Sequence, residues 1–239
     1  MFGFRNGVGM LNELCYNNDL TIIAVQEHWL RADDLDKFNL VHSDYNFHAI
    51  SSMCSAASVG IVKERPFGGV AFLWHKSVNG CINFIQADTN ERCLVFKLNL
   101  GQKSILLFNL YLPCNENSSE YRAEIAFYVG FIEIILNTVP FSDVIILGDT
   151  TFDINDVNAG YLLLKPLLLN YNIVHCDDLI NGPIQCTYDN TALGQSSRID
   201  HFFVTPFVRP CASQVLIIDS GLILSTIGLL SYASAAAGL

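Results

Sequence analysis

Short apolar runs separated by polar turn residues occupy much of the chain. Residues 20–26 (LTIIAVQ) are almost wholly apolar and rich in β-branched side chains, which predicts a strand covered on both faces. Residues 92–100 (RCLVFKLNL) alternate cleanly, as a strand does. Turn-type residues separate the last four of five closely spaced runs, so we predict an antiparallel meander. The five runs are YNFHAI at 45–50, GVAFLWH at 69–75, CINFIQA at 81–87, RCLVFKLNL at 92–100 and SILLFNLYL at 104–112.

The clearest helical pattern spans residues 118–137, where large apolar side chains fall on one stripe. Asn117 and Glu120 have the spacing of a capping box, which predicts the start of this helix. Residues 159–171 (AGYLLLKPLLLNY) also have a helical period, but we expect Pro166 to kink or divide the helix. Two more helices are predicted, at residues 8–15 and at residues 31–38.

Further strands and the balance of elements indicate the fold class. There are about twice as many predicted strands as helices, and no repeat or linker divides the chain. We therefore expect one domain of the α+β class, in which two sheets pack face to face and helices lie outside. The additional strands are predicted at 143–148, 172–176, 186–188, 197–205 and 214–219.

The segment 220–239 contains no charged residue and is long enough for a membrane-spanning helix. It is rich in Ser, Gly and Ala, however, and no Lys or Arg flanks it as an anchor. Two interpretations stay open, a tail anchor and a final core strand followed by a loose end. We favour the second, because QVLIID at 214–219 has the pattern of a buried strand, and we do not expect a membrane partner.

Composition narrows the classes of function. Apolar residues make up 51% of the chain and charged residues 15%, which excludes a disordered, collagen-like or coiled-coil protein. The net charge is −10, whereas proteins that bind polyanions through their overall field are basic. Any nucleic-acid partner must therefore be bound through a local site or a metal ion. The eight cysteines lack zinc-site spacing and the first residues lack a signal peptide, so we expect an intracellular protein, in the nucleus or cytoplasm. We also expect a monomer.

Three carboxylates stand at the ends of apolar strands. Glu27 follows TIIAVQ, Asp149 follows VIILG, and Asp200 lies within SSRIDHFFV. Any one of them alone would be read as a capping or salt-bridging group, because buried acids are almost always paired. Three such positions in one chain favour a shared cation. Mg²⁺ suits such a site, since it takes one or two carboxylates together with water and phosphate oxygens, and Mn²⁺ is an alternative.

Several motifs together resemble a known superfamily. TIIAVQEHWL, RPFGGVAFLWHKS, LLFNLYLPC, VIILGDTTFDI, TY at 187–188 and SSRIDHFFV occur in the order found in the endonuclease/exonuclease/phosphatase superfamily. The chain looks most like the endonuclease domain of non-LTR retrotransposon polyproteins, which is similar to apurinic/apyrimidinic endonucleases and deoxyribonuclease I. The resemblance implies a domain at 1–228 followed by an irregular apolar tail at 229–239. It also implies a four-layer α/β/β/α sandwich with Mg²⁺-dependent phosphodiester hydrolysis at one edge of the paired sheets.

The resemblance assigns a role to four residues. Glu27 matches the metal-binding glutamate of the QE motif, and Tyr111 matches the tyrosine that contacts the scissile phosphate. Asp149 matches the aspartate of the GDxN motif, which takes part in metal binding and orients or activates the attacking water. Asp200 matches the aspartate that supports the catalytic histidine in many members.

Three further residues are candidates for contacting a substrate phosphate. Thr151 stands where GDxN has its asparagine and offers a hydroxyl in place of the two-ended amide. Arg198 and His201 flank Asp200, and by their chemistry they could contact a phosphate or orient Asp200. The alternative for His201 is a structural role, and the other histidines show no ligand spacing.

The chain also departs from the family pattern. The asparagine of the family's first motif would fall one position ahead of Met1. In the family's C-terminal serine-aspartate-histidine element, Ser225 fits, but Thr226 and Ile227 replace the acid and the histidine. An isoleucine can neither transfer a proton nor stabilise an oxyanion.

Three hypotheses for function follow. The first is a Mg²⁺-dependent DNA endonuclease domain of retroelement origin that uses no small-molecule cofactor. The second is an inactive copy that keeps the fold. The third is a phosphoesterase that acts on a small phosphorylated substrate, such as an inositol phosphate or a sphingomyelin-type lipid.

Overall fold

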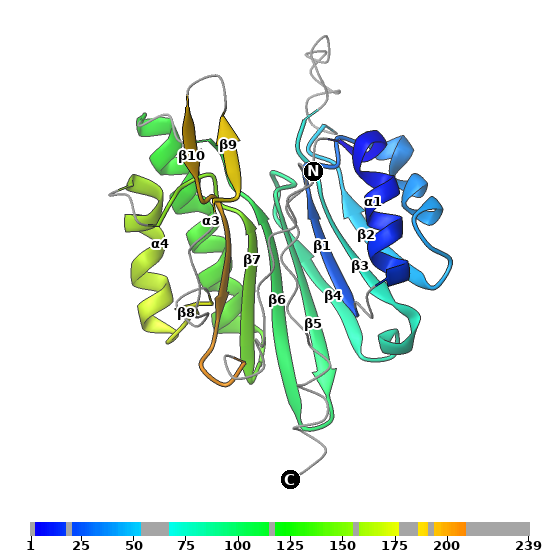
Figure 1. The fold of residues 1–239 in the computed structure, drawn as a ribbon. Helices are drawn as coiled ribbons and strands as arrows, with labels where there is room; N and C mark the ends of the chain where they lie inside the picture. Colours follow the sequence, from blue (N-terminus) through cyan, green and yellow to red (C-terminus); the bar gives the residue numbers. More distant parts are fainter. Residues whose placement is uncertain are drawn as a thin grey trace.

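Two β-sheets pack face to face, and each carries helices on its outer side (Figure 1). The computed structural model describes residues 3–17, 21–53, 67–114, 118–154, 158–176, 186–190 and 194–208. The α+β sandwich predicted from the sequence is confirmed, with the layers in the order helix, sheet, sheet, helix. The predicted strand at 214–219 and the segment 220–239 lie outside the described residues.

The smaller sheet has the strand order β1-β3-β2, and both pairs are antiparallel. Its outer face is covered by α1 and by the 3-10 helix η1, which pack through Phe4, Leu11 and Phe38 onto Ile23, Val25 and Leu73. The elements are α1 (Phe4–Asn17), β1 (Ile22–Gln26), η1 (Ala32–Leu40), β2 (Tyr45–Ile50) and β3 (Val70–His75).

The larger sheet has the order β4-β5-β6-β7-β11-β8 and is antiparallel except for the parallel pair β6–β7. Helix α3 connects these two parallel strands, and α3 and α4 cover the outer face. The elements are η2 (Lys76–Val78), β4 (Ile82–Ala87), β5 (Cys93–Leu100), β6 (Lys103–Tyr111), α3 (Ser119–Thr138), β7 (Asp143–Asp149), α4 (Ala159–Asn170), β8 (Val174–His175) and β11 (Asp200–Val204).

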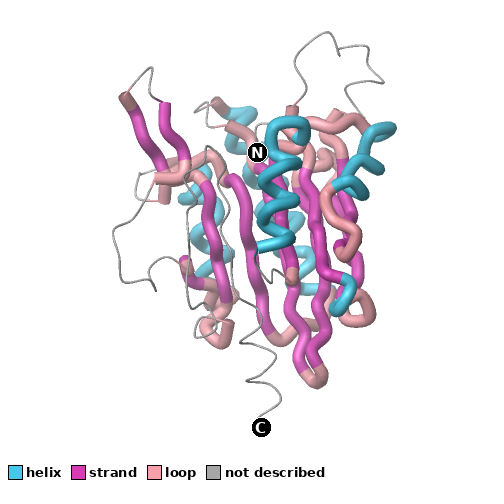
Figure 2. The backbone as a smooth tube through the Cα atoms, turned by 45° about the vertical axis from the view of Figure 1, so that its right-hand side comes forward, coloured by secondary structure: helices cyan, strands magenta, loops and turns pink. Residues whose placement is uncertain are grey.

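A hairpin of β9 (Tyr188–Asn190) and β10 (Gln195–Ser197) leads into β11. In both views of the chain it stands beyond the edge where β7 ends and β11 begins (Figures 1 and 2). No helix in the described ranges is long and apolar enough to cross a membrane.

Strand β5 has apolar side chains on both of its faces. Leu94, Phe96 and Leu98 point into the core between the sheets. Cys93 and Val95 point the other way, into the core beneath α3 and α4. Because successive side chains of a strand face opposite sides, one run of residues serves two cores.

Three local predictions are corrected by the structure. The meander is broken: β2 and β3 belong to the smaller sheet, whereas only β4, β5 and β6 form a continuous antiparallel run. Helix α3 is capped one residue later than predicted, by Ser118, whose hydroxyl accepts the Tyr121 amide at 3.1 Å. Pro166 does not divide α4. It lies on the exposed side of the helix, where water can hydrogen-bond to the helix carbonyl for which Pro166 has no N–H donor.

Candidate active site

Strand directions bring three predicted site residues to one edge of the larger sheet. Because β6 and β7 are parallel, Tyr111 and Asp149 end side by side and pair in the ladder. Strand β11 runs the other way, so its first residue, Asp200, pairs with Asp149 at the same edge. All three share the side of the sheet that faces the smaller sheet, since they are in phase with inward-facing residues such as Ile145, Leu107 and Phe202.

The fourth predicted residue comes from the smaller sheet. Glu27 directly follows the last residue of β1. Its carboxylate Oε1 accepts a hydrogen bond of 2.7 Å from the Tyr111 hydroxyl. The structure therefore brings Glu27, Tyr111, Asp149 and Asp200 together from two sheets, although they are far apart in sequence.

A buried amide joins the two sheets beneath this edge. Asn109 on β6 is fully buried, and its Nδ2 donates to the carbonyls of Val25, at 3.2 Å, and Ala71, at 2.8 Å. Its Oδ1 accepts from Nε2 of Gln26 at 2.6 Å. Since Gln26 precedes Glu27, this bridge fixes the position of Glu27 relative to β6. Asn109 is not among the residues predicted from the sequence, although it is a lone amide in the apolar run LLFNLYL, and such an amide must find partners when buried.

Tyr111 is held as a hydrogen-bond donor. Burial raises its pKa, and the hydrogen bond to Glu27 and that residue's charge raise it further, so the phenol stays protonated. The guanidinium of Arg92 lies 5.0 Å from the centre of the Tyr111 ring, within range of a cation–π interaction. A cation thus stands beside the acidic edge.

The two aspartates have raised pKa values. Burial raises the pKa of Asp149 to about 8, and the nearby charges of Asp200 and Glu27 act in the same direction. The Thr151 amide, which donates to Asp149 Oδ1 at 2.8 Å, opposes this rise. Burial also raises the pKa of Asp200 to about 6, against a hydrogen bond from Thr187. Both carboxyl groups therefore keep a proton more readily than free aspartates, and because they interact their titration belongs to the pair.

Thr187 positions Asp200 in a way that the sequence alone did not reveal. Its hydroxyl oxygen accepts from the backbone amides of Ile199, at 2.9 Å, and Asp200, at 3.1 Å. The same hydroxyl hydrogen-bonds the Asp200 carboxyl group. One side chain thus fixes both the main chain and the carboxylate.

Thr151 makes two contacts within the protein at this edge, and its contact with a phosphate stays a prediction. Its hydroxyl donates to the carbonyl of Pro113, so its single donor hydrogen is already engaged. Its φ of 59° lies in the left-handed region, which is unfavourable for a β-branched residue. The backbone amide of Thr151 donates a hydrogen bond to the carboxylate of Asp149.

Arg198 and His201, the other two candidates for a phosphate contact, are both buried. Arg198 is 5% exposed; burial lowers its pKa, and the charge of Asp153 opposes this. His201 is fully buried, with Nε2 3.0 Å from the Phe152 carbonyl and Nδ1 2.9 Å from Nε2 of His175. Because side chains alternate along β11, His201 faces the helix layer, whereas Asp200 faces the other sheet. The contact of these two residues with a phosphate stays a prediction, and the hydrogen bonds of His201 support the structural alternative. Ser225, Thr226 and Ile227 lie outside the described residues.

The donor set at this edge suits a hard divalent cation. Glu27, Asp149 and Asp200 supply carboxylate oxygens, which Mg²⁺ and Mn²⁺ prefer. Their mutual repulsion contributes to the raised pKa of Asp149, and a cation would relieve it. In the part of the chain that the structure describes, no three His, Cys, Asp or Glu side chains form a ready-made metal site.

Comparison with known proteins identifies the fold. No protein-family model and no curated protein sequence matches the chain. Among solved structures, the 3′ phosphatase NExo from Neisseria, bound to a product DNA hairpin, is 14% identical with a TM-score of 0.68, covering 93% of each chain. An AP endonuclease from Archaeoglobus fulgidus is 16% identical with a TM-score of 0.66, covering 91% of this chain and 89% of its own. The endonuclease domain of TRAS1, a telomere-specific non-LTR retrotransposon, is 13% identical with a TM-score of 0.62, covering 92% of each chain.

These likenesses identify the fold of the chain. The chain has the fold of the endonuclease/exonuclease/phosphatase superfamily, as its motifs predict. At such identities the comparisons establish the fold, and the activity has to be argued from the site.

Proposed function

We propose that this chain is a Mg²⁺-dependent phosphodiesterase that acts on DNA, with its active site at the edge formed by Glu27, Tyr111, Asp149 and Asp200. The observation that carries the proposal is their convergence, with Tyr111 hydrogen-bonded to Glu27 and the pKa of Asp149 raised to about 8. Polar groups with shifted pKa values gathered at one edge are typical of catalytic sites. The superfamily fold and its nuclease and phosphatase neighbours support the same class of reaction.

Each residue has a role that its surroundings support. Glu27 and Asp149 would hold the metal ion, which would neutralise charge on the scissile phosphate and the leaving oxygen. Tyr111 is kept protonated and can donate to a phosphate oxygen. Asp149, which lies between Tyr111 and Asp200 at the sheet edge, would accept the proton of the attacking water as a general base. Asp200, braced by Thr187, raises the basicity of Asp149 by its charge.

A bound metal ion would also allow this acidic protein to bind DNA, which is itself negatively charged. With a net charge of −10, the protein as a whole repels a polyanion. A divalent cation inverts the sign of the field at the acidic edge, so a phosphodiester can approach there. DNA is favoured over a small phosphoester because the neighbours described above include a DNA-bound phosphatase and an AP endonuclease. The motif resemblance to retrotransposon endonucleases and the TRAS1 likeness support a retroelement origin.

Nicking of supercoiled plasmid tests the proposal. We expect nicking in Mg²⁺ or Mn²⁺, none in excess EDTA, and loss of at least about 100-fold in rate in Glu27→Gln, which keeps the shape of the side chain but removes its charge. Glu133→Gln, at an exposed position on α3, is the matched control and should nick at the wild-type rate. Nicking that persists in EDTA or in Glu27→Gln would contradict the mechanism.

A second candidate function rests on the replaced motif positions. Ile227 cannot transfer a proton and Thr151 lacks the amide of GDxN, which favours an inactive copy that keeps the metal site. Binding of Mn²⁺ by wild type without any nicking would identify this case. Inhibition by inositol phosphates rather than by duplex DNA in a competition assay would instead identify a small-substrate phosphoesterase.

A further inference from the structure

The turn that carries Glu27 has an unusual backbone. Glu27 and Trp29 both have φ of 57°, in the left-handed region that residues with a Cβ adopt at a cost in free energy. Neither position is Gly or Asn, the residues that tolerate this region best. Two such residues in three positions require neighbours that hold them there. Between them stands His28, whose side chain is fully buried.

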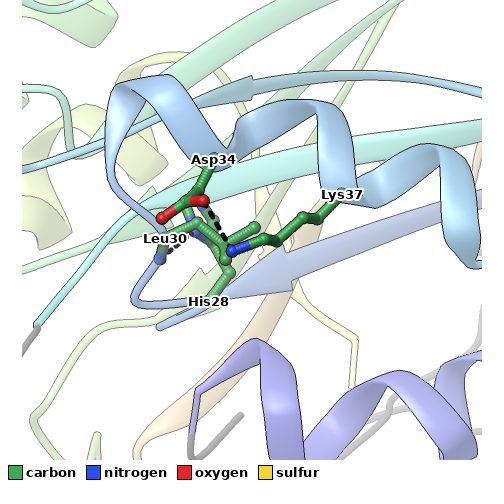
Figure 3. Close-up of polar contacts among 4 residues, drawn as sticks. All are labelled: His28, Leu30, Asp34 and Lys37. Carbon is green, nitrogen blue, oxygen red and sulfur yellow. Dashed lines mark hydrogen bonds and ion pairs between the residues drawn. The ribbon is translucent and has the colours of Figure 1, made fainter.

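The His28 ring closes the turn from inside. Its Nδ1 accepts a hydrogen bond of 3.0 Å from the Leu30 amide, as Figure 3 shows. A ring nitrogen that accepts carries no proton, so the proton of the neutral ring is on Nε2. Nε2 lies 2.9 Å from the carbonyl of Ile50, at the end of β2, and donates to it. One ring thus bonds its own turn and a neighbouring strand.

Gly69 leaves room for this ring. A Cβ on Gly69 would lie 2.4 Å from the His28 ring, and Gly69 itself has φ of 87°. The carbonyl of the preceding Gly68 accepts the Trp29 amide at 3.0 Å. The GGV sequence before β3 therefore fits against the EHW turn after β1.

The start of α1 holds the outer side of the same turn. The amide of Gly3 donates to the Glu27 carbonyl at 3.2 Å, and the amide of Phe4 donates to the His28 carbonyl at 2.7 Å. The Asp34–Lys37 ion pair, also drawn in Figure 3, lies on η1 with both side chains about two fifths exposed. An exposed pair of this kind contributes little, which makes it a useful control.

We propose that His28 is a positioning residue that locks Glu27 in its left-handed conformation and so directs the Glu27 carboxylate at Tyr111 and the aspartate pair. The expected effect on metal binding rests on the proposed function. The lock itself, meaning the hold of the His28 ring on the turn at residues 27–30, does not. Residues that orient a metal ligand typically change metal affinity by about 10–100-fold when they are replaced.

The test uses variants that remove the two ring hydrogen bonds separately. His28→Phe keeps a ring but removes both bonds. In His28→Asn the amide oxygen can still accept the Leu30 amide, and in His28→Gln the longer amide can still donate to Ile50. We expect His28→Phe to raise the Kd for Mn²⁺, measured by calorimetry without substrate, by about tenfold. We expect faster hydrogen exchange at the Leu30 amide, and partial recovery of both in His28→Asn.

Two controls separate positioning from general destabilisation. Asp34→Asn, on the neighbouring ion pair, should leave the Kd unchanged. Ile132→Ala, in the core under α3, should lower Tm without changing the Kd. The inference is overturned if His28→Phe binds Mn²⁺ within twofold of wild type, or if Ile132→Ala weakens binding as much. Should His28→Phe fail to fold, the same comparison is made between His28→Asn and His28→Gln.

Failure of the proposed function would leave the lock testable. If wild type binds no Mn²⁺, the metal site is wrong, and the contact between His28 and Gly69 decides the inference. Gly69→Ala should lower Tm strongly in wild type, because the added methyl group meets the ring, and less in a His28→Ala background. Additive effects of the two substitutions, together with unchanged exchange at Leu30, would refute the lock.

Discussion

At the residue scale, Thr151 is a β-branched residue held in the left-handed region, with φ of 59°. Asn tolerates this region several-fold better than Thr and has both an amide donor and a carbonyl acceptor. We expect Thr151→Asn to raise the free energy of unfolding by about 1 kcal/mol, since strain of this kind costs about 1–3 kcal/mol. Nicking should become at least about tenfold faster because the motif amide is restored. Denaturant unfolding and the plasmid assay measure the two effects. Thr151→Val, which keeps the branching and loses the hydroxyl, should be less stable than wild type.

Also at the residue scale, the raised pKa of Asp149 makes stability depend on pH. Without divalent cations, the folded state keeps its proton up to about pH 8, whereas the unfolded chain releases it near pH 4. The folded state therefore binds more protons across that window, and stability falls as pH rises from about 5 to 8. Asp149→Asn should flatten this dependence by an amount on the order of a few kcal/mol. Urea unfolding in EDTA at several pH values checks it, with the exposed Asp36→Asn as control. An equally steep fall in Asp149→Asn would contradict the assignment.

At the scale of elements, the sequence predicts what is local. Strand β5 and helix α3 follow from periodicity because each places apolar residues at the spacing of its own geometry. The assignment of each strand to a sheet does not follow from periodicity. β3 and β4 are neighbours in sequence with similar patterns, and only long-range strand pairing places them in different sheets. Glu27, Asp149 and Asp200 could be found because a charge at the end of an apolar strand needs an explanation. The direction of His201 could not be predicted, because it depends on the register of β11 against β7.

The bridge at Asn109 is the element-scale feature with the largest expected effect. Asn109→Ala removes the partners of two buried carbonyls, on β1 and β3, and of the Gln26 amide. Each buried group left unpaired costs about 1–3 kcal/mol, so we expect a loss of at least about 2 kcal/mol in the free energy of unfolding. Nicking should fall as well, because Glu27 is no longer held against β6. Asn99→Ala, at an exposed position on β5, should change stability by less than about 0.5 kcal/mol. Similar unfolding midpoints for the two variants would show that Asn109 does not join the sheets.

At the scale of the whole molecule, the net charge of the protein has the same sign as the charge of DNA, its proposed substrate. A basic DNA-binding protein displaces counterions, and its affinity falls steeply with salt. This chain has 13 Lys and Arg against 23 Asp and Glu, so under the proposed function its affinity for DNA would come from a metal ion held at the carboxylate edge. We expect a duplex oligonucleotide to bind in Mg²⁺ and to dissociate when EDTA is added. The slope of log K against log salt should be small, about −1 to −3, since few phosphates are neutralised. Fluorescence anisotropy at several NaCl concentrations, with and without Mg²⁺, measures both. Binding that survives EDTA with a steep salt slope would place the DNA on a basic surface instead of on the carboxylate edge.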